Sequence, residues 1–182
     1  RLAAQQTIGP SLGADSLAKS LQAGLYGLLA VAAFMIIYYR LPGVVAVLAL
    51  LVYSALVLAI YKLFPVTLTL AGIAGFILSL GMAVDANVLI FARLREELKA
   101  GRPLAQAVAE GFRRAWLSIR DSHITTLLGA IVLYLFTTSF VKGFALTLGI
   151  GVLASLFSAI IVTRAFLDGF ISPWFEKKKW LF

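Results

Sequence analysis

Five long runs of apolar residues limit what this chain can fold into. They lie at about 21–39, 44–61, 66–91, 124–140 and 144–166, and polar segments separate them. A helix needs roughly 20 apolar residues to span a hydrocarbon core about 30 Å thick. Because each run approaches or exceeds this length, we predict an all-α fold: a polytopic membrane helix bundle with five transmembrane helices.

The composition agrees with a membrane protein and excludes several kinds of site. Hydrophobic residues make up 62% of the chain and charged residues 13%, whereas about a quarter of a soluble domain is charged. With no cysteine and one histidine, a disulfide, a thiol nucleophile or a metal centre is not expected. The chain also lacks a P-loop, a nucleophile elbow and paired catalytic carboxylates. We expect a non-enzymatic component without a cofactor, whose energy comes from outside the chain or from an ion gradient.

The connections between the runs differ in length. Residues 40–43 and 62–65 contain Pro or Gly and predict tight turns. The long polar segment 93–121 contains Gly101, which can end one helix, and Pro103, which can begin another. Apolar residues then recur at helical spacing, at Leu104, Val108, Phe112, Ala115, Trp116 and Ile119. This pattern predicts an amphipathic helix that lies along the cytoplasmic membrane surface.

The distribution of Lys and Arg predicts the orientation in the membrane. Most of the 16 basic residues fall at the turn around Arg40, in 93–121 and after the last run, including the basic tail 172–182. The positive-inside rule places these segments in the cytoplasm. It also explains the net charge of +8 without a nucleic-acid partner. The lead-in 1–20 is then extracytoplasmic, and a chain that begins there with Arg1 is expected to be part of a longer protein.

Asp85 is the residue in the third run that most needs an explanation. A carboxylate within a bilayer costs roughly 2.5–3.5 kcal/mol on insertion scales, so it requires a partner, water or a function. An apolar environment favours the protonated carboxyl, which suits exchange of a proton near neutral pH. Gly81, one turn earlier, leaves space beside it. The alternative is a structural role, in which Asp85 reaches the interface or pairs with Arg93 or Arg95.

Small and polar residues form rows in three of the runs. Asn87 continues the row Ser79 and Ala83, and either an interhelical hydrogen bond or a proton path explains it. Similar rows are Thr147, Gly151, Ser155 and Ser158 in the fifth run, and Thr125, Thr126 and Gly129 in the fourth. We expect these rows to pack helices together, with a polar lining for water as the alternative.

The single histidine, His123, lies beside Asp121 where the fourth run begins. An imidazole can sense pH near neutrality. A histidine at a membrane interface more often bonds a carboxylate or a carbonyl, and this second interpretation is favoured here.

Several segments resemble the SecD family. Residues 81–91, Gly-Met-Ala-Val-Asp-Ala-Asn-Val-Leu-Ile-Phe, resemble the signature of its fourth transmembrane helix, and Arg93 and Arg95-Glu96-Glu97 follow as in that family. Residues 7–13, 141–145 and 163–164 resemble the segments that enter its second helix and form its last one. Ala92 and His123 depart from the family, which usually has Glu and Asn at these positions.

This resemblance implies a fold and a task. SecD and SecF belong to the resistance-nodulation-division superfamily, and the five runs would be helices two to six of a subunit whose first helix and large extracytoplasmic domain lie outside this chain. The family assists late preprotein export across the bacterial inner membrane and uses the proton motive force. Its essential aspartate maps onto Asp85. The implied partners are SecF, separate or fused, the SecYEG translocon, YajC, the preprotein and the lipid bilayer. The alternatives are a passive scaffold that docks SecF and the translocon, or half of a drug or lipid exporter.

Overall fold

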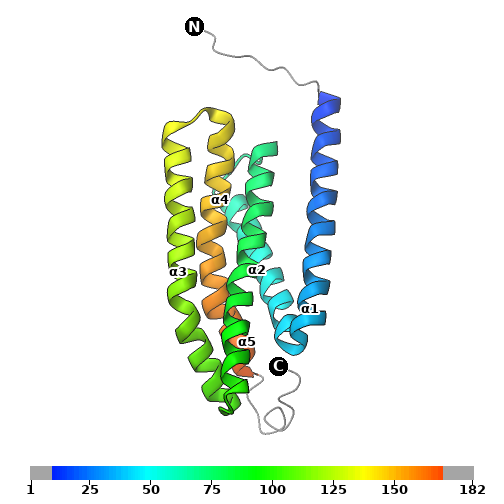
Figure 1. Ribbon diagram of the computed structural model, residues 1–182. Coiled ribbons are helices and arrows are strands. Elements are labelled where there is room, and N and C mark those ends of the chain that lie inside the picture. The colour runs from blue at the N-terminus through cyan, green and yellow to red at the C-terminus, as the bar shows by residue number, and fades with distance from the viewer. Residues whose placement is uncertain (1–9, 170–182) are drawn as a thin grey trace.

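The computed structural model describes residues 10–169, which fold into a bundle of helices without a strand in that range (Figure 1). The elements are α1 (Pro10–Leu63), α2 (Leu70–Lys99), α3 (Leu104–Phe136), α4 (Ser139–Phe157), the π-helix η1 (Ser158–Val162) and α5 (Thr163–Gly169). The predicted all-α membrane bundle is therefore confirmed. The basic tail 172–182 and the first nine residues of the lead-in lie outside the described residues.

Within residues 10–169, four helices are long and apolar enough to span a membrane, so the predicted count of five is not matched. The difference lies in α1, where two helices that meet at the predicted turn 40–43 are joined into one element across a kink. The first two apolar runs belong to α1, which turns back on itself so that its two arms run in opposite directions (Figure 1). Arg40 alone has non-helical angles, φ 51° and ψ −116°. A Cβ at Gly43 would lie 2.0 Å from the carbonyl oxygen of Met35, so only glycine permits this close reversal. We call 10–39 the first arm and 41–63 the second arm.

The predicted helix end at Gly101 and helix start at Pro103 are confirmed, but segment 93–121 does not form a separate surface element. Residues 93–99 end α2 and residues 104–121 begin α3, with Gly101 (φ 85°) in the turn. The apolar stripe of this segment packs against α2, where Ile90, Phe91 and Leu94 contact Leu104, Val108, Phe112 and Ile119 in one buried cluster. The amphipathic pattern thus has a protein partner and does not need a lipid surface.

α2 packs mainly against α4, and small residues allow the close approach. A Cβ at Gly75 would lie 2.6 Å from the carbonyl oxygen of Phe144, and one at Gly151 would lie 2.2 Å from Ser79 Oγ. Such contacts are typical of helix packing in membranes, where close van der Waals contact drives association. α2 and α4 therefore form the closely packed centre of the bundle, while the first arm of α1 lies at its edge (Figure 1).

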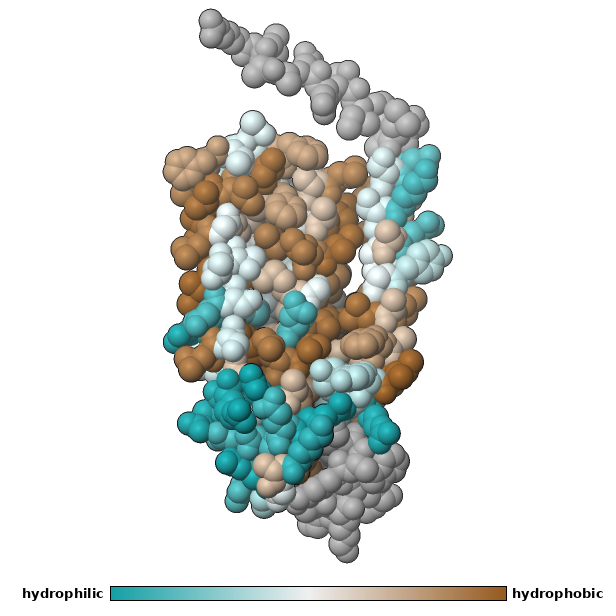
Figure 2. Space-filling view, in the orientation of Figure 1, coloured by the Kyte–Doolittle hydropathy of each residue, from teal (hydrophilic) through white to brown (hydrophobic). Residues whose placement is uncertain are grey.

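The surface divides into an apolar and a polar part. Figure 2 shows hydrophobic residues over most of the helices and a hydrophilic end where α2 and α3 meet. α2 has 30 residues, which gives a length of about 45 Å at 1.5 Å per residue. Since a hydrocarbon core is about 30 Å thick, the polar end of α2 extends beyond it.

Candidate functional site

Asp85 lies near the middle of α2 and its side chain is exposed on the outside of the bundle. Within residues 10–169, its carboxylate forms no ion pair and no hydrogen bond. Its neighbour Gly81 is exposed too, and a Cβ placed there would meet nothing within 4 Å. An ionisable group in a spanning helix, with open space beside it and no partner of its own, is a candidate functional site.

The two arginines considered as partners of Asp85 have other contacts. Arg93 pairs with Glu96, with 2.8 Å between guanidinium nitrogen and carboxylate oxygen. This donation holds the pKa of the Glu96 carboxyl below its ordinary value. Arg95 donates to the carbonyl oxygen of Tyr38 at 2.9 Å and lies over the Tyr38 ring, 5.1 Å from its centroid. Arg93 therefore stabilises the end of α2, and Arg95 joins α2 to the reversal in α1.

A small cavity connects Asp85 with α3. It has a volume of about 30 Å³, and Met82, Asp85, Ala86, Leu89, Ile119, Ser122 and His123 line it. This volume is sufficient for about one water molecule. The structure thus brings the carboxyl of α2 and the imidazole of α3 to the same cavity, a proximity that the sequence separation of these residues did not reveal.

His123 is buried and has a hydrogen-bond partner at each ring nitrogen. Nδ1 lies 2.8 Å from the carbonyl oxygen of Ile119, and Nε2 lies 2.9 Å from Ser155 Oγ on α4. Ser155 Oγ also lies 2.8 Å from the carbonyl oxygen of Val152, to which its hydroxyl can donate. The carbonyl contact agrees with the sequence interpretation of this histidine, whereas the link to Ser155 was not expected.

Asn87 is buried two residues after Asp85 and links α2 to the first residue of α5. Its Oδ1 accepts a hydrogen bond of 2.8 Å from Thr163 Oγ1. Thr163 directly follows η1, and π-helical turns occur frequently at functional sites. Ser158, the first residue of η1, donates to the carbonyl oxygen of Ala49 at 3.1 Å. The π-helix is therefore fixed to both α1 and α2, and no pattern in the sequence indicated it.

Two buried tyrosines of the second arm contribute hydroxyl groups that sequence analysis missed. Tyr53 and Ser79 are 2.7 Å apart between their hydroxyl oxygens. Because Ser79 donates its single proton to the carbonyl oxygen of Phe76 at 2.7 Å, Tyr53 is the donor to Ser79. Tyr61 donates to the carbonyl oxygen of Thr147 at 3.1 Å. Together with the pair His123–Ser155, these bonds form a polar interior between α1, α2, α3 and α4.

The remaining candidate residues lie away from this interior. Thr125 is exposed and donates to the carbonyl oxygen of Asp121 at 2.8 Å on its own helix. Thr126 does the same to Ser122 at 3.1 Å. Gly129 is exposed and has no atom within 4 Å of its Cβ position. Both threonine hydroxyls therefore bond the backbone of α3 itself, and the space beside Gly129 is open.

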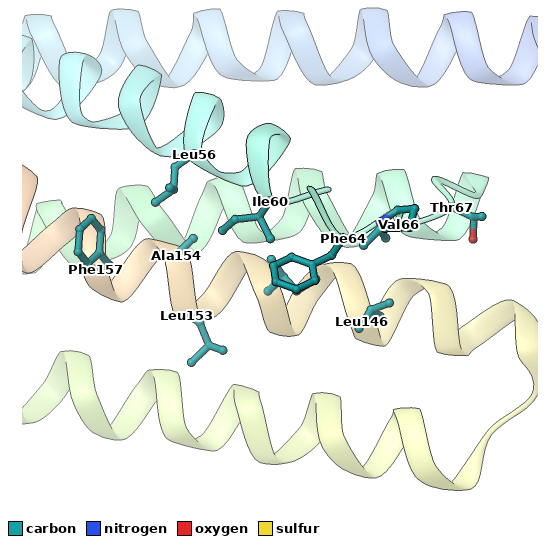
Figure 3. A pocket seen from close by; sticks show the side chains of 11 residues that line it. Leu56, Ile60, Phe64, Val66, Thr67, Leu146, Leu153, Ala154 and Phe157 are labelled. Atoms are coloured by element: carbon teal, nitrogen blue, oxygen red, sulfur yellow. The ribbon is translucent and has the colours of Figure 1, made fainter. Parts of the chain in front are cut away.

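An apolar groove of about 830 Å³ lies between the second arm of α1 and α4 (Figure 3). Leu56, Ile60, Phe64, Leu146, Leu153 and Phe157 are among its lining residues. Its lining contains no titratable side chain, so it offers no acid–base chemistry. In addition, residues 10–169 contain no group of three His, Cys, Asp or Glu side chains placed to hold a metal ion.

Comparison with known proteins gives a consistent result over most of the chain. Residues 1–171 match the family described as "Protein export membrane protein SecD/SecF, C-terminal". The chain is 58% identical to the protein translocase subunit SecD of Thermobaculum terrenum and 48% identical to that of Pseudomonas aeruginosa. These alignments cover 96% and 98% of this chain but 35% and 29% of the relatives. The chain therefore spans about a third of the length of the relatives that it matches.

Solved structures agree with this comparison. The crystal structure of SecDF from Thermus thermophilus, described as a translocon-associated membrane protein, has a TM-score of 0.87 and 47% identity. The match covers 90% of this chain and 23% of that one. A second SecDF structure, in a super-membrane-facing form, gives a TM-score of 0.83 at the same identity, with 89% of this chain and 22% of that chain covered.

Proposed function

The chain belongs to the SecD/SecF C-terminal family of protein export membrane proteins, and from this premise we propose that it is the membrane part of a proton-driven preprotein translocase subunit. It lies in the bacterial cytoplasmic membrane with its first arm entering from the outside. It assists late export through the SecYEG translocon together with SecF, separate or fused, and with YajC. The preprotein contacts an extracytoplasmic domain outside this chain. The names of the relatives and the four membrane-length helices support this proposal.

The observation that carries the proposal is the unpartnered carboxylate of Asp85 on the outer surface of a spanning helix. A charge there costs several kcal/mol in lipid, so a group from another helix must satisfy it when it is ionised. We place SecF against this face of α2 and assign the proton-coupling role to Asp85. Protonation removes the charge and with it the reason for that contact.

The energy of one proton is sufficient for such a switch. Moving one elementary charge through the membrane potential supplies about 2.3 kcal/mol per 100 mV. A shift of a few kcal/mol changes which of two conformations is populated. Because Gly75 and Gly151 hold α2 and α4 in close contact, a tilt of α2 carries α4 with it. Arg95 connects the same helix to the reversal at Tyr38, from which the first arm leads toward the extracytoplasmic side.

The test compares Asp85→Asn with the wild type in the full-length subunit, reconstituted with SecF and the translocon. Asn preserves the size of the side chain and abolishes its titration. We expect the stimulation of preprotein export by an imposed proton gradient to fall about tenfold or more, which corresponds to ~1.4 kcal/mol. Expression and association with SecF should persist.

Asp168→Asn is the matched control, because Asp168 is exposed near the end of α5 and pairs with Arg164 at 3.7 Å. This variant should export normally. Unchanged export with Asp85→Asn would reject proton coupling at this residue and favour a passive scaffold that docks SecF and the translocon.

A further inference from the structure

The hydrogen bonds of His123 fit two protonation states without any movement of heavy atoms. The carbonyl oxygen of Ile119 can only accept, so Nδ1 carries a proton in both states. Nε2 faces Ser155 Oγ, a group that can either donate or accept. The position of a single proton at Nε2 therefore decides the direction of the bond between α3 and α4.

In the neutral state, the Ser155 hydroxyl donates to Nε2. In the charged state, Nε2–H donates to Ser155 Oγ, and the hydroxyl proton of Ser155 turns to the carbonyl oxygen of Val152, 2.8 Å away. Each arrangement satisfies both ring nitrogens. A buried donor or acceptor that loses its partner is costly, but this ring keeps a partner at each nitrogen in either state.

Asp85 is the charged group that acts on this ring from the facing helix. The two side chains line the same small cavity, which has a volume of about 30 Å³. α4 presents the Ser155 hydroxyl to the ring. On α3, Asp121 pairs with Arg120 at 2.8 Å on the exposed side, and Arg164 of α5 lies over the Phe112 ring, 5.8 Å from its centroid. An ionised Asp85 favours the imidazolium, and a protonated Asp85 removes this support.

We propose that His123 is a second proton-binding group of this chain and shares one proton with Asp85. In one state, Asp85 is ionised and His123 is charged. In the other, an O–H bond has formed at Asp85 and the N–H bond at Nε2 has broken, so the pair remains neutral overall. This inference rests on the proposed function only in treating Asp85 as a group that exchanges protons.

The shared proton carries the state of Asp85 into the bundle. Reversal of the His123–Ser155 bond changes whether Ser155 donates to the backbone of α4, three residues before η1 begins. Thr163, at the other end of η1, donates to Asn87, two residues from Asp85. Asp85 and His123 are therefore connected to both ends of the π-helix, through Ser155 on α4 and through Asn87 and Thr163.

The decisive experiment is histidine NMR on the full-length subunit with SecF in lipid vesicles, with imidazole nitrogens labelled. The signal that disappears in His123→Asn belongs to His123. We expect Nδ1 to stay protonated throughout the titration. In Asp85→Asn, the midpoint of the Nε2 titration should move to lower pH by about one unit, as expected on loss of a nearby opposite charge. Asp168→Asn should leave it in place.

An unchanged midpoint in Asp85→Asn, or a neutral ring protonated at Nε2, would overturn the inference. The export assay separates it from the proposed function. If the midpoint shifts but gradient-stimulated export by Asp85→Asn is normal, the proton pair exists and the proposed function fails. If export by Asp85→Asn is lost but the midpoint does not move, the proposed function stands and His123 is not part of it.

Discussion

Two faces of α2 carry similar residues and have opposite surroundings. On the face toward α4, Gly75 and Ser79 are buried in contact with neighbouring atoms, and Asn87 bonds Thr163. On the other face, Gly81 has open space and Asp85 has no bond within residues 10–169. A small-polar row that is satisfied inside the chain holds the bundle together. A row without such bonds leaves its polar group open to a proton or to a group from another helix, as at Asp85.

The largest expected difference in stability is between Gly75→Ala and Gly81→Ala, which add the same methyl group to the two faces of α2. In Gly75→Ala, the new Cβ would lie 2.6 Å from the carbonyl oxygen of Phe144, a backbone atom that cannot turn away. We expect a loss of about 1–3 kcal/mol from overpacking, measured as a lower unfolding temperature in detergent. Gly81→Ala, on the same helix, meets nothing within 4 Å and should be neutral or slightly stabilising, since Ala favours helix. Equal losses in both variants would show that the two faces do not differ.

The sequence predicted the fold well because its strongest signals are local. Runs of about 20 apolar residues define spanning helices whatever their neighbours, and the carboxylate of Asp85 is conspicuous in any such run. The errors arose where tertiary contacts decide. The turn at 40–43 was predicted, but the close approach of Gly43 to Met35, which keeps both arms in one element, was not. The stripe of 104–119 packs on α2, although its pattern suits a membrane surface equally well.

The site was harder to predict than the fold for the same reason. Periodicity gives the angle between residues on one helix but not which neighbour each row faces. It therefore grouped Thr125 with Ser155, although Thr125 is exposed and Ser155 is buried against His123. In the sequence, Tyr53 and Tyr61 cannot be distinguished from ordinary apolar positions, because only the structure shows the partners of their hydroxyl groups.

A smaller effect should distinguish the two partners of the buried pair Tyr53–Ser79. Tyr53→Phe removes a donor but leaves Ser79 bonded to the carbonyl oxygen of Phe76. We expect a cost of about 0.6 kcal/mol, typical of interhelical hydrogen bonds in membrane proteins. Ser79→Ala removes the acceptor of Tyr53 and leaves a buried hydroxyl without a partner, which costs about 1–3 kcal/mol.

Chemical or thermal unfolding in micelles measures both variants, with the exposed Tyr26→Phe as a control for the loss of a hydroxyl group. A greater loss in Tyr53→Phe than in Ser79→Ala would contradict the direction assigned to this bond and weaken the description of this face of α2 as fully satisfied.

The smallest effect concerns the end of α2, where two neighbouring arginines face different surroundings. Arg93 and Glu96 form an exposed pair, and such pairs contribute only about 0–1 kcal/mol. Arg95 instead donates to Tyr38 and lies over its ring, so it joins α2 to the reversal of α1.

In Arg95→Gln, we expect broader distances between spin labels on the first arm and on α2, with little change in unfolding temperature. Arg93→Gln should leave these distances as narrow as in the wild type. If both variants broaden these distances equally, the charge of this region as a whole holds the first arm. Arg95 is then not the specific link between α2 and the first arm.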